Sequence, residues 1–177
     1  ATELLAQNSK FDVAMLRATF QDHSLPFSWN WDKTHDTLIA GHLLASNKPH
    51  DLTSMAVQYL GQDIEPLEKA LEAAVKKCRS HCQHRLTEWR IAKNGLAEMP
   101  SAKEKTWKYD CWLPKALARE LGEPNDHPWY MVLQEYANAD SAITIALWGV
   151  MIQEIRRRGL EEIYMIRRKA MELAHEM

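Results

Sequence analysis

Two short segments of the chain each end in an aspartate and carry residue types that suit metal-dependent chemistry. Asn8–Asp12 reads Asn-Ser-Lys-Phe-Asp, and Tyr136–Asp140 reads Tyr-Ala-Asn-Ala-Asp. Carboxylate oxygens are hard ligands, and hard ligands suit divalent cations such as Mg²⁺. Because Tyr136 and Asp140 are four residues apart in a helical pattern, they share one helix face and can reach one site. The spacing therefore predicts a site that combines Tyr136 with Asp140.

In their order, these segments resemble the second and third motifs of DEDD-type 3′–5′ exonucleases, and the tyrosine resembles that of the subclass containing the proofreading domain of family A DNA polymerases. The resemblance implies an α/β RNase H-like (DnaQ-like) fold that hydrolyses the 3′-terminal nucleotide of DNA with two divalent cations, Mg²⁺ or Mn²⁺. It assigns metal binding to Asp12 and Asp140. It also implies that Tyr136 orients the attacking water and that Asn8 lies near the substrate backbone. Taken alone, Asp12 is equally a helix-dipole partner and Asn8 a turn residue.

The resemblance covers residues 4–61 and 128–177, about 110 positions. Asp36–Ala40, His50–Leu52 and Tyr59–Gly61 look like parts of the helices that follow the second motif in family A polymerases, although each alone is an ordinary capped helix. Residues 159–177 look like the helix that leads from the exonuclease domain into the polymerase domain. Arg167 departs from that pattern, because a glutamate commonly stands near this position.

The first exonuclease motif, Asp-x-Glu on an opening strand, has no counterpart here, since only seven residues precede Asn8. Two of the four expected carboxylates are therefore missing. We expect residues 1–158 to be a partial exonuclease domain, truncated before its first motif, and residues 159–177 to lead into a polymerase domain that is absent. Such a chain should have little or no exonuclease activity of its own.

The spacing of apolar residues predicts a mostly helical chain with one or two strands. Leu4–Gln7 and Trp29–Trp31 are the predicted strands. Asp36 or Thr37 is expected to cap a helix, and Gly61 to end the next one. The other predicted helices run from Phe11 to near Ser24, from Leu67 onward, from Pro114 to near Gly122, from Asp126 to Arg158 and from Leu160 to Met177.

Positive charge is concentrated in the middle of the chain. Residues 76–119 hold eleven Lys and Arg against four Asp and Glu, a balance of +7 in a chain of net charge −2. Residues 76–125 are predicted to be a basic helical insertion that binds single-stranded DNA by stacking and by phosphate contacts. The candidate residues are Lys103, Lys105, Trp107, Lys108 and Tyr109. A solvated helical face or a small core of the insertion would have the same composition.

The cysteines and the hydropathy favour an enzyme of a reducing compartment. Cys78, Cys82 and Cys111 do not form the two ligand pairs of an ordinary zinc site, so we expect no zinc. No signal peptide and no membrane-spanning run is visible. We therefore expect a cytoplasmic protein of a bacterium or a phage-infected host cell. Its expected partners are the DNA primer 3′ end, single-stranded DNA and the polymerase domain of the same chain, and no membrane.

Two other functions fit parts of the sequence. RNA exonucleases of the ribonuclease D type share the earlier motifs but not the exit helix. A nucleic-acid-binding remnant without catalysis would explain the missing first motif. The residues that neighbour this chain in the intact protein would discriminate among the three.

Overall fold

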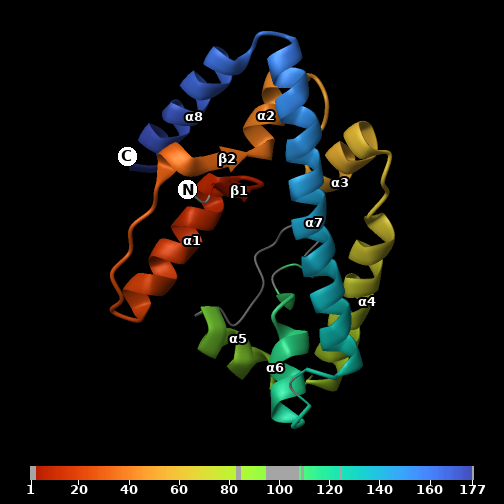
Figure 1. Cartoon of the computed structure of the whole chain (residues 1–177). Helices are drawn as coiled ribbons and strands as arrows, with labels where there is room; N and C mark the ends of the chain where they lie inside the picture. The colour runs from red at the N-terminus through yellow and green to blue at the C-terminus, as the bar shows by residue number, and fades with distance from the viewer. Residues whose placement is uncertain (1–2, 83–84, 95–107, 109, 124, 177) are drawn as a thin grey trace. The chain divides into compact units, whose positions relative to one another are not determined.

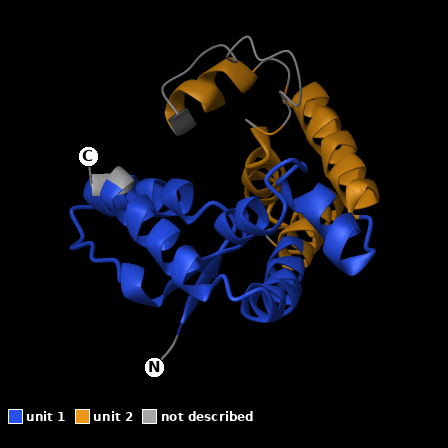
Figure 2. Cartoon of the chain, turned by 90° about the horizontal axis from the view of Figure 1, so that it is seen from above, with its two compact units in different colours: residues 1–63, 140–177 blue, residues 64–139 orange. Residues whose placement is uncertain are grey.

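The chain folds into two compact units that are mostly helical. The computed structural model describes residues 3–82, 85–94, 108, 110–123 and 125–176 (Figure 1). One unit contains residues 1–63 and 140–177, and the other contains residues 64–139 (Figure 2). Within the described part of the chain, two short strands form one parallel pair. The prediction of a mostly helical chain with one or two strands is therefore confirmed.

The first unit opens with a strand, a helix and a second strand. β1 (Leu4–Ala6) pairs with β2 (Thr34–Asp36), and α1 (Ser9–Asp22) lies between them in sequence. Leu4 is opposite Thr34 in the parallel register. Parallel neighbours cannot be joined by a tight turn, so they need a crossover connection. α1 provides the helix of that crossover.

The second strand lies further along the chain than the sequence predicts. Trp29–Trp31 is predicted to be a strand, but Trp31–Lys33 forms a 3-10 turn and the strand follows it. Aromatic packing explains the difference. The ring centroids of Phe27 and Trp29 are 6.4 Å apart, and those of Trp29 and Trp31 are 6.3 Å apart. These rings contact one another along the loop instead of alternating across a sheet.

The buried carboxylate of Asp36 joins the starts of two helices. Its Oδ1 accepts a hydrogen bond from the backbone N–H of Leu38 at 2.8 Å, in the first turn of α2 (Thr37–Leu44). Its Oδ2 accepts from the backbone N–H and the hydroxyl of Ser9, at 2.6 and 2.7 Å, where α1 begins. Helix starts leave N–H groups without intrahelical partners, and a carboxylate is a strong acceptor for them. The predicted cap of α2 is confirmed, and the same side chain also holds α1.

Two glycines have structural roles in this part of the first unit: Gly61 ends a helix, and Gly41 lies close to a buried side chain. α3 (Leu52–Met55) continues into a π-helical turn at Ala56–Leu60, which ends at Gly61 with a φ of 66°. The predicted end of this helix at Gly61 is therefore confirmed. On α2, a Cβ added to Gly41 would lie 2.7 Å from the Sδ atom of the fully buried Met55. Any larger residue at Gly41 would push α2 and Met55 apart.

The C-terminal helices complete the first unit. α7 (Pro128–Arg157) belongs to this unit from Asp140 onward, and α8 (Glu161–Glu176) follows it. Gly159 separates them with a φ of 66°, as predicted. The buried face of α7 consists of Ile143, Thr144, Leu147, Met151 and Ile155. Among the described residues, no helix combines the length and the apolar character needed to cross a membrane.

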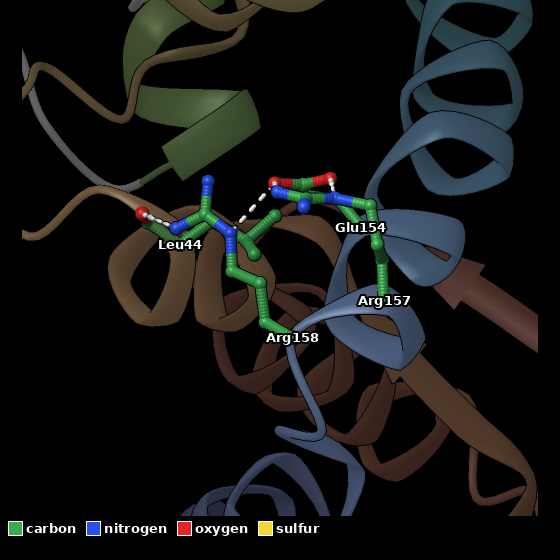
Figure 3. Close-up of polar contacts among 4 residues, drawn as sticks. All are labelled: Leu44, Glu154, Arg157 and Arg158. Carbon is green, nitrogen blue, oxygen red and sulfur yellow. Dashed lines mark hydrogen bonds and ion pairs between the residues drawn. The ribbon is translucent and has the colours of Figure 1, made fainter.

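An ionic cluster connects the end of α7 to the end of α2 (Figure 3). The Glu154 carboxylate accepts two hydrogen bonds of 2.7 Å from Arg157 and one of 2.6 Å from Arg158. Arg158 Nη1 also donates to the carbonyl oxygen of Leu44, the last residue of α2, at 3.1 Å. A cation at this position satisfies a free carbonyl and suits the negative end of the helix dipole. Hydrogen bonds from Arg157 and then Arg158 lower the pKa of Glu154 to about 2.

The second unit packs helices around two apolar clusters. It comprises α4 (Glu65–His81), α5 (Leu86–Asn94), α6 (Leu113–Glu120) and the first part of α7. One cluster contains Cys78, Cys82, Leu113 and Leu117, and the other contains Leu71 and Val75. The basic insertion predicted at residues 76–125 lies within residues 64–139 and stays a prediction.

Ion pairs inside the second unit use several of its basic residues. Asp110 is only 1% exposed and accepts hydrogen bonds from Arg79 at 2.7 Å and from Arg90 at 2.6 Å. Two further pairs join Lys108 to Glu68 and Arg85 to Glu120. A buried carboxylate needs such partners, because an uncompensated charge is costly away from water. Part of the positive balance of this segment is therefore neutralised within the unit.

Replacing Asp36 with alanine should destabilise the protein by about 2–4 kcal/mol, because two helix caps are lost and buried N–H groups lose their acceptor. The free energy of unfolding in urea measures the effect. Asp51→Ala is the control, since the exposed Asp51 caps α3 through the backbone N–H of Ser54. It should cost about 1 kcal/mol or less. Equal losses in the two variants would contradict the double role of Asp36.

Glu154 should stabilise the protein only where its carboxyl is ionised. Its pKa in the folded state lies at about 2, below the ordinary 4.5, so its contribution is complete above pH 4.5 and is lost as the pH falls towards 2. Glu154→Gln should therefore lower the urea midpoint at neutral pH and match the wild type near pH 2. Glu135→Gln, at an exposed position of α7, should keep the wild-type pH profile. A difference that is constant with pH would contradict the role of the charge.

Candidate functional site

One cavity of the first unit is lined by both aspartates that the sequence singles out. Its volume is about 490 Å³, and its walls include Asp12 from α1 and Asp140 from α7. β1 and the start of α3 supply other parts of the lining. The polar residues Gln7, Ser141 and Thr144 also face this cavity. The fold thus brings two carboxylates from opposite ends of the chain to one concave surface.

Asp12 is positioned by the start of α1. It lies in the first turn, where the backbone is held through Asn8 and Ser9. The backbone N–H groups of Asn8 and Ser9 donate to the Asp36 carboxylate at 3.2 and 2.6 Å. Asn8 itself has a left-handed φ of 69°, a conformation that asparagine tolerates better than most residues. The buried Asp36 therefore anchors the backbone at the start of the helix that carries Asp12.

The environment of Asp12 opposes its negative charge. Partial burial of the carboxyl, and then the nearby negative charge of Asp36, raise the pKa of Asp12 above its ordinary value. Such an environment disfavours a bare carboxylate and favours one that is neutralised by a cation. Perturbed carboxyl groups in a cavity are typical of functional sites, although ion-pair networks also produce them.

Asp140 reaches the cavity from α7. The residue is half-buried, and the Thr144 hydroxyl donates to its backbone carbonyl at 2.8 Å, one helical turn further along. Because residues four apart share a face of a helix, Asp140 and Thr144 line the same wall. α7 is regular through this region, so the position of Asp140 depends on the packing of Ile143 and Leu147 beneath it.

The other residues of the predicted catalytic motifs lie in different surroundings. Tyr136 is one helical turn before Asp140 on α7 and belongs to the second unit, where it packs against Leu71 and Val75. Asn8 is exposed and occupies the residue before α1, as a turn residue does. The roles assigned to Tyr136 in orienting water and to Asn8 in binding the substrate stay predictions.

Most of the predicted DNA-binding residues lie outside the described part of the chain. These are Lys103, Lys105, Trp107 and Tyr109. Lys108 is described, and its Nζ atom lies 3.1 Å from Glu68. The Lys108 side chain thus forms an ion pair within its own unit, and it would have to give up this pair to bind a phosphate.

Two functional contributions were not visible in the sequence. Gln7 faces the cavity, and its amide donates to the carbonyl of His50 at 2.9 Å while its oxygen accepts from the Thr37 hydroxyl. Gln7 thereby ties the end of β1 to α2. Asp36 is recognisable from its sequence only as the cap of α2. No local signal reveals that either residue would contact a segment so far along the chain.

The donor chemistry of the cavity fits a hard divalent cation. Asp12 and Asp140 offer carboxylate oxygens, and Mg²⁺ is commonly held by one or two carboxylates together with substrate phosphates. Among the described residues, no group of three or more His, Cys, Asp or Glu is placed to hold a metal. The described residues of the cavity therefore supply two of the four carboxylates that the two-metal reaction uses.

The cysteine pair has a structural environment. Cys78 and Cys82 are buried in the apolar cluster formed by α4 and α6. Burial raises the pKa of Cys78 to about 12 and also raises that of Cys82. Metal ligation requires the thiolate, which this environment disfavours.

Comparisons with protein-family models, curated proteins and solved structures found no match to this chain. Any assignment of function therefore depends on the residues and the geometry described above.

Replacing Asp12 with asparagine should stabilise the protein at pH 7. The raised pKa means that the folded state favours the protonated carboxyl, so the wild type loses stability as the pH rises through the pKa of the folded state. Below the ordinary value of 3.8 the two proteins should be equally stable. Urea denaturation at pH 3 and pH 7 measures the difference. Asp32→Asn, at an exposed acid of the same unit, is the control and should show no such gain. An Asp12→Asn protein that is less stable at pH 7 would contradict the raised pKa.

Proposed function

We propose that this chain is part of a 3′–5′ exonuclease domain of the DEDD tyrosine subclass, which removes the 3′-terminal nucleotide of DNA during proofreading. The observation that carries the proposal is the joint position of Asp12 and Asp140 in one cavity. Their sequence motifs are short, and either alone would carry little weight. A shared cavity is what a common metal site requires of two such distant residues.

The residues of the cavity have distinct roles in this proposal. Asp12 and Asp140 would hold the cations, and the raised pKa of Asp12 favours a bound cation over a bare carboxylate. When bound, two divalent cations would lower the pKa of the attacking water and neutralise the phosphodiester. The Tyr136 hydroxyl would orient that water, a positioning role. A mismatched 3′ end frays more readily than a paired one, so it would reach the cavity more often.

The arrangement of the first unit is compatible with the proposed fold. A parallel βαβ crossover is a building block of α/β folds, and β1, α1 and β2 form one. An RNase H-like domain formed by residues 1–158 belongs to the proposal, as does the role of residues 159–177 as a helix that leads into a polymerase domain.

A nucleic-acid-binding role without hydrolysis is the second candidate. It is favoured by the count of acids at the cavity, where the described residues provide Asp12 and Asp140 rather than four carboxylates. In that case the cavity would bind a cation weakly and the 3′ end would remain intact.

Metal binding and hydrolysis together test the proposal. This chain should bind Mn²⁺, and Asp12→Asn and Asp140→Asn should each weaken the affinity about tenfold or more, as loss of a ligand does. Asp32→Asn should match the wild type, because Asp32 does not line this cavity. Isothermal titration calorimetry measures the affinity. Equal Mn²⁺ affinity in all four proteins would contradict a metal site formed by Asp12 and Asp140.

The accompanying assay follows the 3′ end of labelled single-stranded DNA. In the polypeptide that carries this chain in the cell, Asp140→Asn should abolish Mg²⁺-dependent release of nucleoside monophosphates and spare any polymerase activity. Tyr136→Phe should slow release by about 10²-fold while leaving Mn²⁺ binding intact. An intact 3′ end in the wild-type polypeptide would favour the second candidate, and faster degradation of RNA than of DNA would favour a ribonuclease.

A further inference from the structure

The second unit contains an aromatic cavity that the exonuclease proposal does not use. Its volume is about 410 Å³. Trp89 from α5, Trp112 at the start of α6, and Lys115 and Arg119 from α6 line it. Two indole rings and two cations on one concave surface are the components with which proteins hold unpaired nucleotides.

The two indole rings are held in place by the core of the unit. Trp89 and Trp112 both pack against the apolar cluster that contains Leu113 and Leu117, and both are only half-buried. Their centroids are 6.4 Å apart, with an angle of 42° between the ring planes. The tilt excludes a sandwich in which a base lies between parallel rings. A base would instead stack on the accessible face of one indole.

The positive charges at this cavity differ from those that bind the buried Asp110. Lys115 and Arg119 are four residues apart on α6, so they share one face, and both are exposed. Neither forms an ion pair with another described residue, and Lys115 Nζ lies 5.9 Å from the ring centroid of Tyr130. Arg79 and Arg90, in contrast, are bound to the buried Asp110. The two cations of α6 therefore remain available to an anion.

We propose that this cavity binds an unpaired nucleotide of a DNA single strand, with the base stacked on Trp89 or Trp112 and adjacent phosphates bound by Lys115 and Arg119. The inference goes beyond the proposed exonuclease cavity, and it rests on the proposed function for the choice of DNA. RNA also offers stacking bases and phosphates, so its binding is measured alongside that of DNA. The site would hold the strand and take no part in hydrolysis.

Stacking is tested by fluorescence anisotropy with a labelled oligothymidine in EDTA, so that no hydrolysis can occur. Trp89→Leu and Trp112→Leu keep apolar packing but remove the ring. At least one of them should weaken binding about tenfold, in the range of a lost base–aromatic stack. The matching Phe variant should restore most of the affinity. An abasic oligonucleotide of the same length should bind the wild type and both Leu variants equally, because it has no base to stack.

The phosphate contacts are tested by salt dependence. Replacing Lys115 and Arg119 together with glutamine should reduce the slope of log affinity against log salt by about 1.4, since each phosphate contact on a single strand contributes about 0.7. The control is Lys76→Gln with Lys77→Gln, which removes the same charge from exposed positions of α4. This control should keep the wild-type slope.

Three results would overturn the inference. They are wild-type affinity in both Leu variants, an unchanged slope in the Lys115 and Arg119 variant, and tighter binding of oligouridine than of oligothymidine. Because these measurements contain no metal, their failure leaves the Mn²⁺ affinities of Asp12 and Asp140 variants untouched. Conversely, if the Asp12 and Asp140 variants bind Mn²⁺ as the wild type does, the proposal that this cavity binds nucleic acid is unaffected.

Discussion

The first unit depends on one buried carboxylate. Asp36 ends β2 and begins α2, and it accepts the N–H groups of Ser9 and Leu38 from two different helices. Its own N–H donates to the Tyr164 hydroxyl of α8 at 3.1 Å. Burial raises the pKa of Tyr164 to about 12, so the phenol stays neutral and can accept that bond. β2, the starts of α1 and α2, and α8 therefore all contact this one residue.

The cost of this arrangement appears at the candidate site. The charge of Asp36 is satisfied by hydrogen bonds, yet it still acts on Asp12, whose pKa it raises together with burial. Local features that oppose stability are common where a protein binds or reacts. The cavity is a candidate for cations because Asp12 and Asp140 both line it.

Local signals in the sequence were enough to predict many element boundaries. The cap at Asp36 and the breaks at Gly61 and Gly159 lie where residue type strongly favours the backbone conformation that is needed. The strand at Trp29–Trp31 was wrong, because packing among aromatic rings overrode their preference for strands.

Long-range contacts were largely beyond the reach of sequence patterns. The convergence of Asp12 and Asp140 was expected from a resemblance rather than from spacing. The links from Gln7 to His50 and from Ser9 to Asp36 had no signal, since a hydrogen bond between distant segments leaves no periodic trace. In the second unit, composition indicated the positive charge but not that Asp110 would occupy two of the arginines.

The division of the chain has a consequence for its synthesis. Residues 64–139 are continuous, whereas the other unit is assembled from residues 1–63 and 140–177. As the polypeptide leaves the ribosome, the continuous unit has all of its residues first and can fold as a unit. Asp36 must wait for Tyr164, which is translated more than a hundred codons later. Until then α1 and α2 lack the contacts that α8 makes with them, and the first unit cannot complete its core.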